Sequence, residues 1–542
     1  MVPTRDSGIV EASHEPYPLI PSFSPSGGEG ARTAVEGDSD RFMASIHVRM
    51  LEVFPAHEPT PSPLPSPPMG ERVAGGRVRG RFMVPMRVKS SGSSLLRRSS
   101  PLIRFAIRAC GRSYRCATTL TMLYERWRQI VKDNRNELAL CAAASGQQWT
   151  FGQLDSAAEN AATTMDAIVY PQGISPEFIF TVLVAWRAGK VVCPLEAGQA
   201  PLPLSKLPPG CVHLKTTSGT TGGPRVIAFT AEQLMADAEN IVATMGLRRD
   251  WPNLGVISLA HSYGFSNLVT PLLLRGIPVV LSDSPLPEAL RRAATTPENI
   301  TLPAVPALWR AWHEAGAIPS NVRLAISAGA PLPLAMEQDV FDVTGIKLHN
   351  FYGASECGGI AYDNSTRPRS DATSVGVPMR NVQLSVNKDG CLEVRSRAVG
   401  ETYWPERQPN LNAGVYCTSD LVELRDGQVF LRGRASDLIN VAGRKVSPEA
   451  IERALLAHPN VRECLVFGAP SHEAERTEII VACIATKSDV TADGLRDFLL
   501  SRLPAWQVPR EWVFVESLKS DQRGKLSRAE WRRRYWERGQ RR

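Results

Sequence analysis

Residues 217–225 read TSGTTGGPR and combine hydroxyl groups, glycines and one cation in a short stretch. The glycines allow backbone N–H groups to turn toward a bound anion, and the hydroxyls add further hydrogen-bond donors. The stretch lies between the apolar runs CVHL and VIAFT and ends in Arg225. Its composition suits a phosphate-binding loop, although it lacks the order of a Walker A motif, and on its own it also fits a flexible linker.

Five further polar segments follow downstream. They are SAGAPLP at 327–333, NFYGASECG at 350–358, YCTSDLVEL at 416–424, GRASDLINVAGRKVSPEAIE at 433–452 and DQRGKLSR at 521–528. Each motif alone is only moderately specific. In this order, all six resemble the motifs of the adenylate-forming superfamily, which includes acyl-CoA synthetases, aryl-CoA ligases, nonribosomal-peptide adenylation domains and firefly luciferase. The resemblance extends over residues 122–535.

The resemblance implies an AMP-forming reaction in two halves. A carboxylate attacks the α-phosphorus of ATP to give an acyl-adenylate and pyrophosphate, and a thiol then displaces AMP. ATP and Mg²⁺ are implied, with CoA or a carrier-protein phosphopantetheine as the thiol acceptor. Such an enzyme acts mainly by positioning and charge stabilisation. The implied partner is a small carboxylic acid, and an acyl carrier protein is a partner only if it, and not CoA, supplies the thiol; no nucleic acid and no membrane span are expected.

The resemblance also assigns the nucleotide-binding residues. In the 217–225 loop they are Thr217, Ser218, Gly219, Thr220, Thr221, Gly222 and Arg225, which would hold the β- and γ-phosphates. Gly329, Ala330 and Pro331 would lie along one face of adenine, and Tyr352 would stack on the other face. Asp420 would accept hydrogen bonds from the ribose hydroxyls.

Four residues would act on the reacting groups according to the same resemblance. Ser355 would bond the α-phosphate, and Glu356 would hold Mg²⁺, which prefers carboxylate and phosphate oxygens. Arg434 would reach the ribose and the phosphates. Lys525 would come from the small domain to the carboxylate and the α-phosphate as negative charge develops. Taken singly, each residue also has an ordinary structural role, and a lone Lys525 would be a solvated surface charge.

The acid pocket is assigned to His261, Val305 and Ala354. No charged side chain dedicated to an α-amino group stands in these stretches, so a fatty or aromatic acid is expected rather than an amino acid. Gly443 matches the glycine that lets pantetheine pass in thioester-forming relatives. The sequence does not choose between CoA and a carrier protein.

The chain departs from the family pattern in several places. Arg225 stands where Lys is usual, and 418–420 read Thr-Ser-Asp instead of Thr-Gly-Asp. The hinge position holds Ser436, followed by Asp437, so a small polar hinge is kept. The N-terminal subdomain is also shortened. These departures motivate a second hypothesis, a catalytically weak relative that binds nucleotide and acts as a regulatory or scaffolding protein.

The order of the strands and helices expected to position these residues predicts an α/β fold. From Met122 onward, apolar runs alternate with helical stretches, which favours a large N-terminal domain of βα units with a mostly parallel sheet. The runs are at 254–260, 277–282, 299–305 and 322–329, with a helix expected at 230–246. Asp-Gly pairs within 382–396 and 420–434 predict two hairpins of a β-rich subdomain.

The C-terminal part predicts a small, mobile α+β domain that begins near Gly433. Ser447-Pro448-Glu449 is typical of a helix start with Ser as the N-cap. The predicted domains are an N-terminal extension at 1–121, a shortened adenylation domain at 122–432, the mobile domain at 433–535 and a basic tail at 536–542. The extension fits a disordered tail, an organellar targeting segment or a translated non-coding repeat.

Composition limits the other function classes. Of the net charge of +8, residues 1–121 contribute +6, so the near-neutral body gives no electrostatic footprint for nucleic acid. No apolar run is long enough to span a bilayer. The ten cysteines are scattered without CxxC pairs, which argues against a disulfide framework or a zinc site. A cytoplasmic protein is expected.

We predict that Arg225→Lys slows adenylation by roughly ten- to a hundredfold, because a planar fork that donates two charge-assisted hydrogen bonds loses one of them, at about 1.5–3 kcal/mol. Single-turnover formation of the acyl-adenylate measures this rate. A near wild-type rate would instead mean that the loop only neutralises the leaving pyrophosphate.

Overall fold

The computed structural model describes residues 121–539, apart from 202–203, 205, 218–224, 413, 471–477 and 519–526. Residues 121–134 form a helix, as expected from Met122 onward. Within this described part, no helix has both the length and the apolar character that crossing a bilayer requires. The eight cysteines located in it are free thiols.

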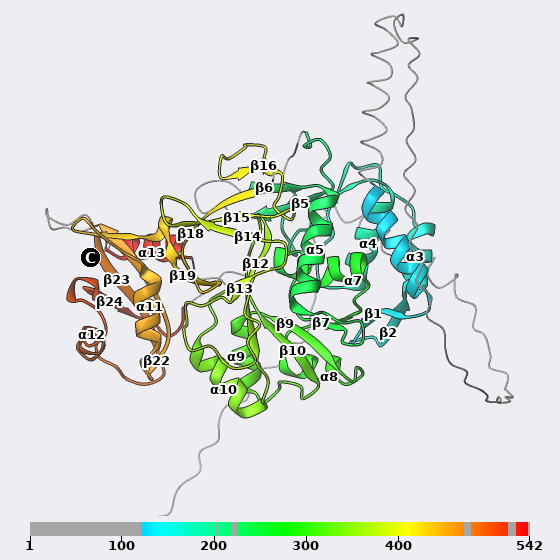
Figure 1. The fold of residues 1–542 in the computed structure, drawn as a ribbon. Helices are drawn as coiled ribbons and strands as arrows, with labels where there is room; N and C mark the ends of the chain where they lie inside the picture. Colours follow the sequence, from blue (N-terminus) through cyan, green and yellow to red (C-terminus); the bar gives the residue numbers. More distant parts are fainter. Residues whose placement is uncertain are drawn as a thin grey trace, which may run out of the picture. The chain divides into compact units, whose positions relative to one another are not determined.

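The predicted parallel sheet forms the centre of the large domain (Figure 1). Its nine strands run in the order β13-β12-β11-β10-β9-β7-β8-β1-β2. Neighbours from β11 to β1 are parallel, and the edge strands pair antiparallel. The strands are β1 Leu138–Ala142, β2 Gln147–Thr150, β7 Asn253–Gly255, β8 Val279–Leu281, β9 Ile300–Ala304, β10 Val322–Ser327, β11 Leu348–Ala354, β12 Gly358–Tyr362 and β13 Val377–Pro378.

All four predicted apolar runs contain a strand of this sheet. The run at 254–260 gives the shortest match, because β7 ends at Gly255 and the chain then leaves the sheet toward His261. The helices of the large domain are α3 Phe151–Asn160, α4 Pro176–Arg187, α5 Ala231–Met245, α6 Ser262–Gly264, η1 Phe265–Val269, α7 Thr270–Arg275, α8 Pro287–Ala294, α9 Pro306–Glu314 and α10 Leu334–Thr344.

Helix α5 begins and ends where local sequence predicts. The side chain of Thr230 accepts from the backbone of Gln233, whose own side chain accepts from the backbone of Thr230, so the two form a capping box. Gly246 ends the helix in the left-handed conformation with φ 68°. The apolar face of α5 packs against α7 and β12.

Two smaller sheets complete the large domain. The first has the order β16-β6-β5-β4-β3, with β3 Ile168–Val169, β4 Val191–Val192, β5 His213–Thr217, β6 Arg225–Phe229 and β16 Thr402–Trp404. The second contains the two predicted Asp-Gly hairpins, built from β14 Gln383–Val386, β15 Cys391–Arg395, β17 Leu411–Asn412, β18 Val415–Arg425 and β19 Gln428–Arg434. Gly390 and Gly427 take the positive φ that these turns need, at 78° and 73°.

The C-terminal part has its own hydrophobic core between α11, α12 and a three-stranded sheet. Its elements are η2 Ala435–Asp437, β20 Ile439–Val441, β21 Arg444–Val446, α11 Pro448–Leu456, β22 Val461–Pro470, β23 Glu478–Thr486, α12 Ala492–Leu500, η3 Ala505–Gln507, β24 Glu511–Phe514 and α13 Arg528–Gly539. The domain limits stay predictions; β19 and α13 run past residues 432 and 535.

The predicted helix start at Ser447-Pro448-Glu449 is confirmed. Ser447 occupies the N-cap position of α11, but its side chain accepts no backbone hydrogen bond there. The hydroxyl instead donates to the carboxylate of Glu449 at 2.7 Å.

Arg528, at the start of α13, binds a cluster of three carboxylates. Its guanidinium lies 2.9 Å from Asp437, 3.0 Å from Glu449 and 2.7 Å from Glu452. Glu452 also accepts from the backbone N–H of Val466 at 2.8 Å. Burial raises the pKa of Glu452 to about 7, although Arg528 opposes the shift.

We predict that Glu452→Gln flattens the pH dependence of thermal stability. The raised pKa means that the folded chain holds a proton which the unfolded chain loses from its ordinary pKa of 4.5 upward. The free energy of unfolding therefore falls as the pH rises from about 4.5 to about 7, and glutamine removes this dependence.

Calorimetric melting temperatures between about pH 5 and pH 8 test this linkage. Glu463→Gln is the matched control, because the side chain of Glu463 accepts from the backbone N–H of Leu518 at 2.8 Å but is 30% exposed. Parallel curves for wild type and Glu452→Gln would contradict the prediction.

Candidate active site

Asp420 joins two of the residues that the sequence assigned to the nucleotide. Its Oδ1 accepts from Nε of Arg434 at 2.8 Å, and its Oδ2 accepts from the hydroxyl of Tyr352. The register of β18 and β19 pairs Asp420 directly with Arg434, while Tyr352 comes from β11 of the central sheet. The structure therefore brings together three residues that lie up to 82 positions apart in the numbering.

The carboxylate of Asp420 is a mostly buried hydrogen-bond acceptor. Burial raises the pKa of the Tyr352 hydroxyl well above its ordinary value, and the neighbouring carboxylate of Asp420 raises it further. The side chain of Asp420 is 13% exposed, whereas that of Arg434 is 55% exposed. The backbone N–H of Asp420 donates to the hydroxyl of Thr418 at 3.0 Å, so the Thr-Ser-Asp segment fixes its own turn.

Glu356 lies in the tight turn between β11 and β12, with Ser355 before it. One of its carboxylate oxygens accepts from the hydroxyl of Tyr403 at 2.8 Å. Burial and then the charge of Glu356 raise the pKa values of both Tyr403 and Tyr416. Ala354, assigned to the acid pocket, ends β11 opposite Gly358 at the same turn.

The predicted adenine segment and acid pocket meet at the ends of parallel strands. Gly329 follows β10 with φ 86°, and a Cβ at this position would lie 3.4 Å from the side chain of Val305, which follows β9. Ala330 and Pro331 continue the same loop toward α10. The carboxyl edge of a parallel sheet is the usual place for a ligand in such folds.

His261 caps the short helix α6 near this edge. Its Nδ1 accepts from the backbone N–H of Tyr263 at 3.3 Å. The hydroxyl of Tyr263 lies 3.5 Å from the carbonyl of Ala304 and 3.4 Å from that of Ile326. The segment therefore crosses the ends of β9 and β10, and it continues into the π-helical turn η1, a feature frequent at functional sites.

The phosphate loop connects two antiparallel strands. Thr217 and Arg225 are paired in the β5–β6 hairpin, so the two ends of the predicted loop are fixed side by side. The residues between them lie outside the described residues, namely Ser218, Gly219, Thr220, Thr221 and Gly222. Lys525 also lies outside them. Their assigned roles stay predictions.

The predicted hinge and thiol-tunnel residues occupy tight backbone turns. Ser436 and Asp437 form η2, where the hydroxyl of Ser436 donates to Asp437 at 3.1 Å. Gly443, with φ 80°, follows Ala442 in the β20–β21 hairpin, and a Cβ there would meet no atom within 4 Å. The turn geometry alone accounts for this glycine, so its role toward pantetheine stays a prediction.

A buried lysine on strand β5 was missed by sequence reasoning. Lys215 on β5 donates to Ser266 at 3.4 Å, and Ser266 donates to Asp237 at 2.6 Å. Asp237 also accepts from the backbone N–H of Gly359 at 3.3 Å, and Gly358 leaves no room for a Cβ beside it. Burial lowers the pKa of Lys215, and the charge of Asp237 opposes this shift.

Tyr403 was also missed, because it stands 47 positions from Glu356 in an unremarkable strand. The sequence signal for Lys215 is a charged residue directly after the stretch CVHL, within the strand HLKTT. Among the described residues, no group of three or more His, Cys, Asp or Glu side chains could hold a metal ion.

Two family models match the chain. One described as AMP-binding enzyme matches residues 211–410, and one described as AMP-binding enzyme C-terminal domain matches residues 450–525. Together they cover just over half of the 542 residues.

Curated relatives are CoA ligases by name. Human mitochondrial malonate–CoA ligase ACSF3 is 26% identical over 365 residues, which is 58% of this chain and 63% of the relative. Anthranilate–CoA ligase of Pseudomonas aeruginosa is 27% identical over 350 residues, 60% of this chain and 67% of the relative. The chain thus spans a little under two thirds of the human relative's length.

Solved structures show the same fold at low identity. ATP-bound MatB from Rhodopseudomonas palustris has a TM-score of 0.67 at 19% identity, over 77% of this chain and 99% of that chain. Bacillus subtilis o-succinylbenzoate CoA synthetase MenE, in complex with the acyl-adenylate OSB-AMP, has a TM-score of 0.64 at 20% identity, over 75% and 97%. The predicted α/β fold with a smaller C-terminal domain is confirmed.

We predict that Asp420→Ala weakens ATP binding by at least about tenfold, because the carboxylate is lost both to the ribose and to its two protein donors, and one charged hydrogen bond contributes about 1.5–3 kcal/mol. Isothermal titration with ATP measures the change. Asp426→Asn, in the exposed turn between β18 and β19, is the control and should bind normally. Wild-type affinity in Asp420→Ala would contradict the assignment.

Proposed function

We propose that this chain, which belongs to the family of AMP-binding enzymes, is an acid–thiol ligase that works in two half-reactions. In the first, a carboxylate oxygen bonds to the α-phosphorus of ATP and the bond from that phosphorus to pyrophosphate breaks. In the second, a thiol sulfur bonds to the acyl carbon, the bond to AMP breaks and the thiol proton passes to solvent.

The observation that supports the proposal most directly is the Asp420 cluster. Asp420, Tyr352 and Arg434 come from two different sheets and meet in one hydrogen-bonded group, at one end of the turn that holds Glu356. Tyr352 provides a flat apolar face for adenine, Asp420 accepts from ribose, and Arg434 places an exposed cation toward the phosphates. The group suits an adenosine monophosphate better than a bare anion, which would need no aromatic face or acceptor.

Magnesium fits the proposed site through Glu356. This carboxylate is a hard oxygen donor, and the Tyr403 hydroxyl orients it through one of its oxygens. When bound, Mg²⁺ would neutralise phosphate charge during displacement of pyrophosphate. Ser355, beside Glu356, would hydrogen-bond the α-phosphate, and Arg225 and the 217–222 loop would hold the leaving pyrophosphate.

The proposed substrate is a fatty or aromatic carboxylic acid, bound beside His261, Val305 and Ala354. The names of the relatives include malonate, anthranilate and long-chain fatty acids as their acids. CoA is the preferred thiol because these relatives are CoA ligases, with carrier-protein phosphopantetheine as the alternative acceptor. A cytoplasmic location remains part of the proposal. A purely regulatory or scaffolding role is not favoured, since no described feature requires it.

We predict acid-dependent exchange of labelled pyrophosphate into ATP. The panel should contain benzoate, anthranilate, malonate, hexanoate and palmitate, and the acid that supports exchange identifies the substrate class. Lys525→Ala should abolish exchange and leave ATP binding largely intact, because its charge acts as the transition state forms. No exchange with any acid would refute the ligase proposal, and near wild-type exchange in Lys525→Ala would refute the role of Lys525.

A further inference from the structure

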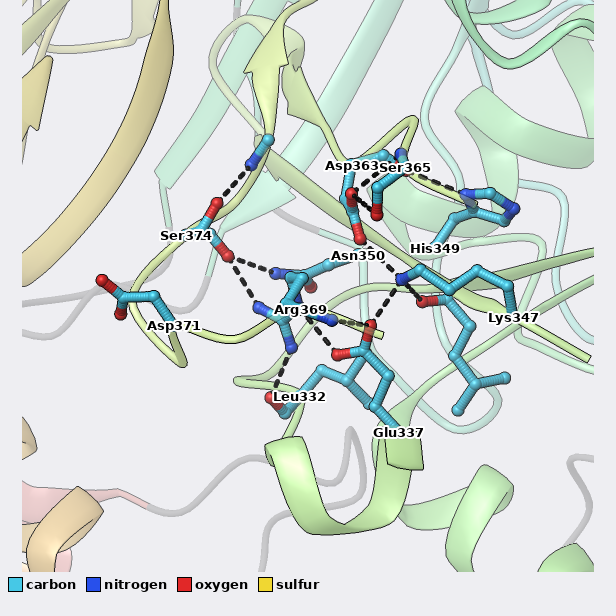
Figure 2. A network of polar contacts seen from close by, with 12 residues as sticks. Leu332, Glu337, Lys347, His349, Asn350, Asp363, Ser365, Arg369, Asp371 and Ser374 are labelled. Carbon is cyan, nitrogen blue, oxygen red and sulfur yellow. Dashed lines mark hydrogen bonds and ion pairs between the residues drawn. The ribbon is translucent and has the colours of Figure 1, made fainter. Parts of the chain in front are cut away.

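Four charged side chains form a buried network in the large domain (Figure 2). The ammonium group of Lys347 donates to Glu337, to the carbonyl of Leu348 at 2.6 Å and to Asp363 at 2.6 Å. Nε of Arg369 donates to the other carboxylate oxygen of Glu337 at 2.8 Å. None of the four charged side chains is more than 7% exposed. Two cations and two carboxylates therefore balance one another away from water.

Burial of this kind is not explained by stability alone. The desolvation of these four charges offsets much of the attraction in their three ion pairs, so well-packed apolar side chains are often as stable or more so. What the ionic network adds is geometry, because each charged bond fixes a distance and a direction. The question is which parts of the molecule it holds in place.

Arg369 holds the loop assigned to adenine. Its Nη2 donates to the carbonyl of Leu332 at 2.8 Å, and Leu332 directly follows Pro331 of that loop. Its Nη1 donates to the carbonyl of Ser374 at 2.6 Å, and its backbone N–H donates to Glu337 at 3.0 Å. Figure 2 shows the guanidinium between Leu332, Glu337 and Ser374.

Ser374 connects Arg369 to β19, the strand that ends at Arg434, the partner of Asp420. Residues 373–376 lie beside β19, with an isolated bridge between Ser374 and Phe430. The backbone N–H of Leu431 donates to Thr373 at 2.8 Å, and that of Val375 donates to the carbonyl of Val429 at 2.9 Å. Strand β19 then ends at Arg434, which binds Asp420. Arg369 is thus hydrogen-bonded to the loop assigned to adenine on one side, and to the segment 373–376 beside β19 on the other.

Lys347 and Asp363, the other half of the network, hold β11, the strand that carries Tyr352. Lys347 directly precedes β11, on which Tyr352 lies, and its bond to Asp363 ties this strand to the end of β12. The ring of His349 adds a contact of 2.9 Å to the carbonyl of Asp363. The loop proposed for one face of adenine and the strand of Tyr352, proposed for the other face, are therefore both hydrogen-bonded to this network of four charges.

We propose that Arg369 is a positioning residue for the adenosine of the nucleotide. It holds the loop at 329–331 at the correct distance from the Asp420–Arg434 pair, without contacting the nucleotide itself. The inference rests on the proposed function, because that function assigns these two places to adenine and ribose. It predicts a defect that is specific to the adenosine part and not to the acid.

The test compares Arg369→Met and Arg369→Lys with wild type. AMP and ATP affinities from isothermal titration should fall about tenfold in both variants, and the KM for ATP in pyrophosphate exchange should rise by the same factor, while the KM for the acid stays within about twofold. Lysine should not rescue, because one ammonium group cannot donate to Glu337, Leu332 and Ser374 in the fork geometry of arginine.

Arg367→Met is the matched control, since Arg367 is exposed and lies in the same segment, and its guanidinium lies over the ring of Phe341 at 5.7 Å. It should bind AMP normally. Near wild-type AMP affinity in Arg369→Lys or Arg369→Met would overturn the inference, as would a defect of equal size in Arg367→Met. If the methionine variant does not fold, Arg369→Lys decides alone. Absence of exchange in wild type refutes the ligase proposal, whereas AMP binding is measured without turnover.

Discussion

Parallel pairing of β9, β10 and β11 is the constraint on which the candidate site depends. Neighbouring parallel strands end at one edge of the sheet, so the segments that follow them must leave it side by side. The closeness of Gly329 to Val305 shows how little space separates two of these segments. A register shift of one residue in β11 would turn Tyr352 to the opposite face and away from Asp420. The pairing of the apolar strands therefore determines where the polar residues of the candidate site lie.

The site also needs the two smaller sheets, because the central sheet does not contain all of its groups. The β18–β19 hairpin supplies Asp420 and Arg434, and β16 supplies Tyr403, which orients Glu356. The segment around Ser374 connects the central sheet to β19 through backbone hydrogen bonds. The β-rich structure after β13 thus supplies part of the proposed nucleotide site.

The sequence predicted those features that local chemistry determines. Alternating apolar runs gave the strands, Thr230 and Gly246 bounded α5, and Asp-Gly pairs gave both hairpins. Motif order predicted that Tyr352 and Asp420 serve one nucleotide, and the structure places them in contact.

What sequence reasoning did not find are contacts between distant elements. Tyr403 and Lys215 have no local pattern that distinguishes them from ordinary strand residues, because their partners are set by how the sheets pack. The helix start at Ser447 was predicted, but the hydrogen bond from its hydroxyl to the side chain of Glu449 was not. The phosphate loop and Lys525 lie outside the described residues, so their roles rest on the sequence.

Two lysines of the large domain are buried, and their charges are stabilised in different ways. Lys347 meets two carboxylates directly, so its charge is neutralised where it stands. Lys215 instead reaches Asp237 through Ser266, and burial lowers its pKa. An unpartnered charge would be unstable in either place. Each lysine therefore depends on its partners: Lys215 is linked through Ser266 and Asp237 to the backbone of Gly359 on β12, and Lys347 donates to the carbonyl of Leu348 on β11. The hydrogen bonds of these buried charges therefore fix the positions of neighbouring elements relative to one another.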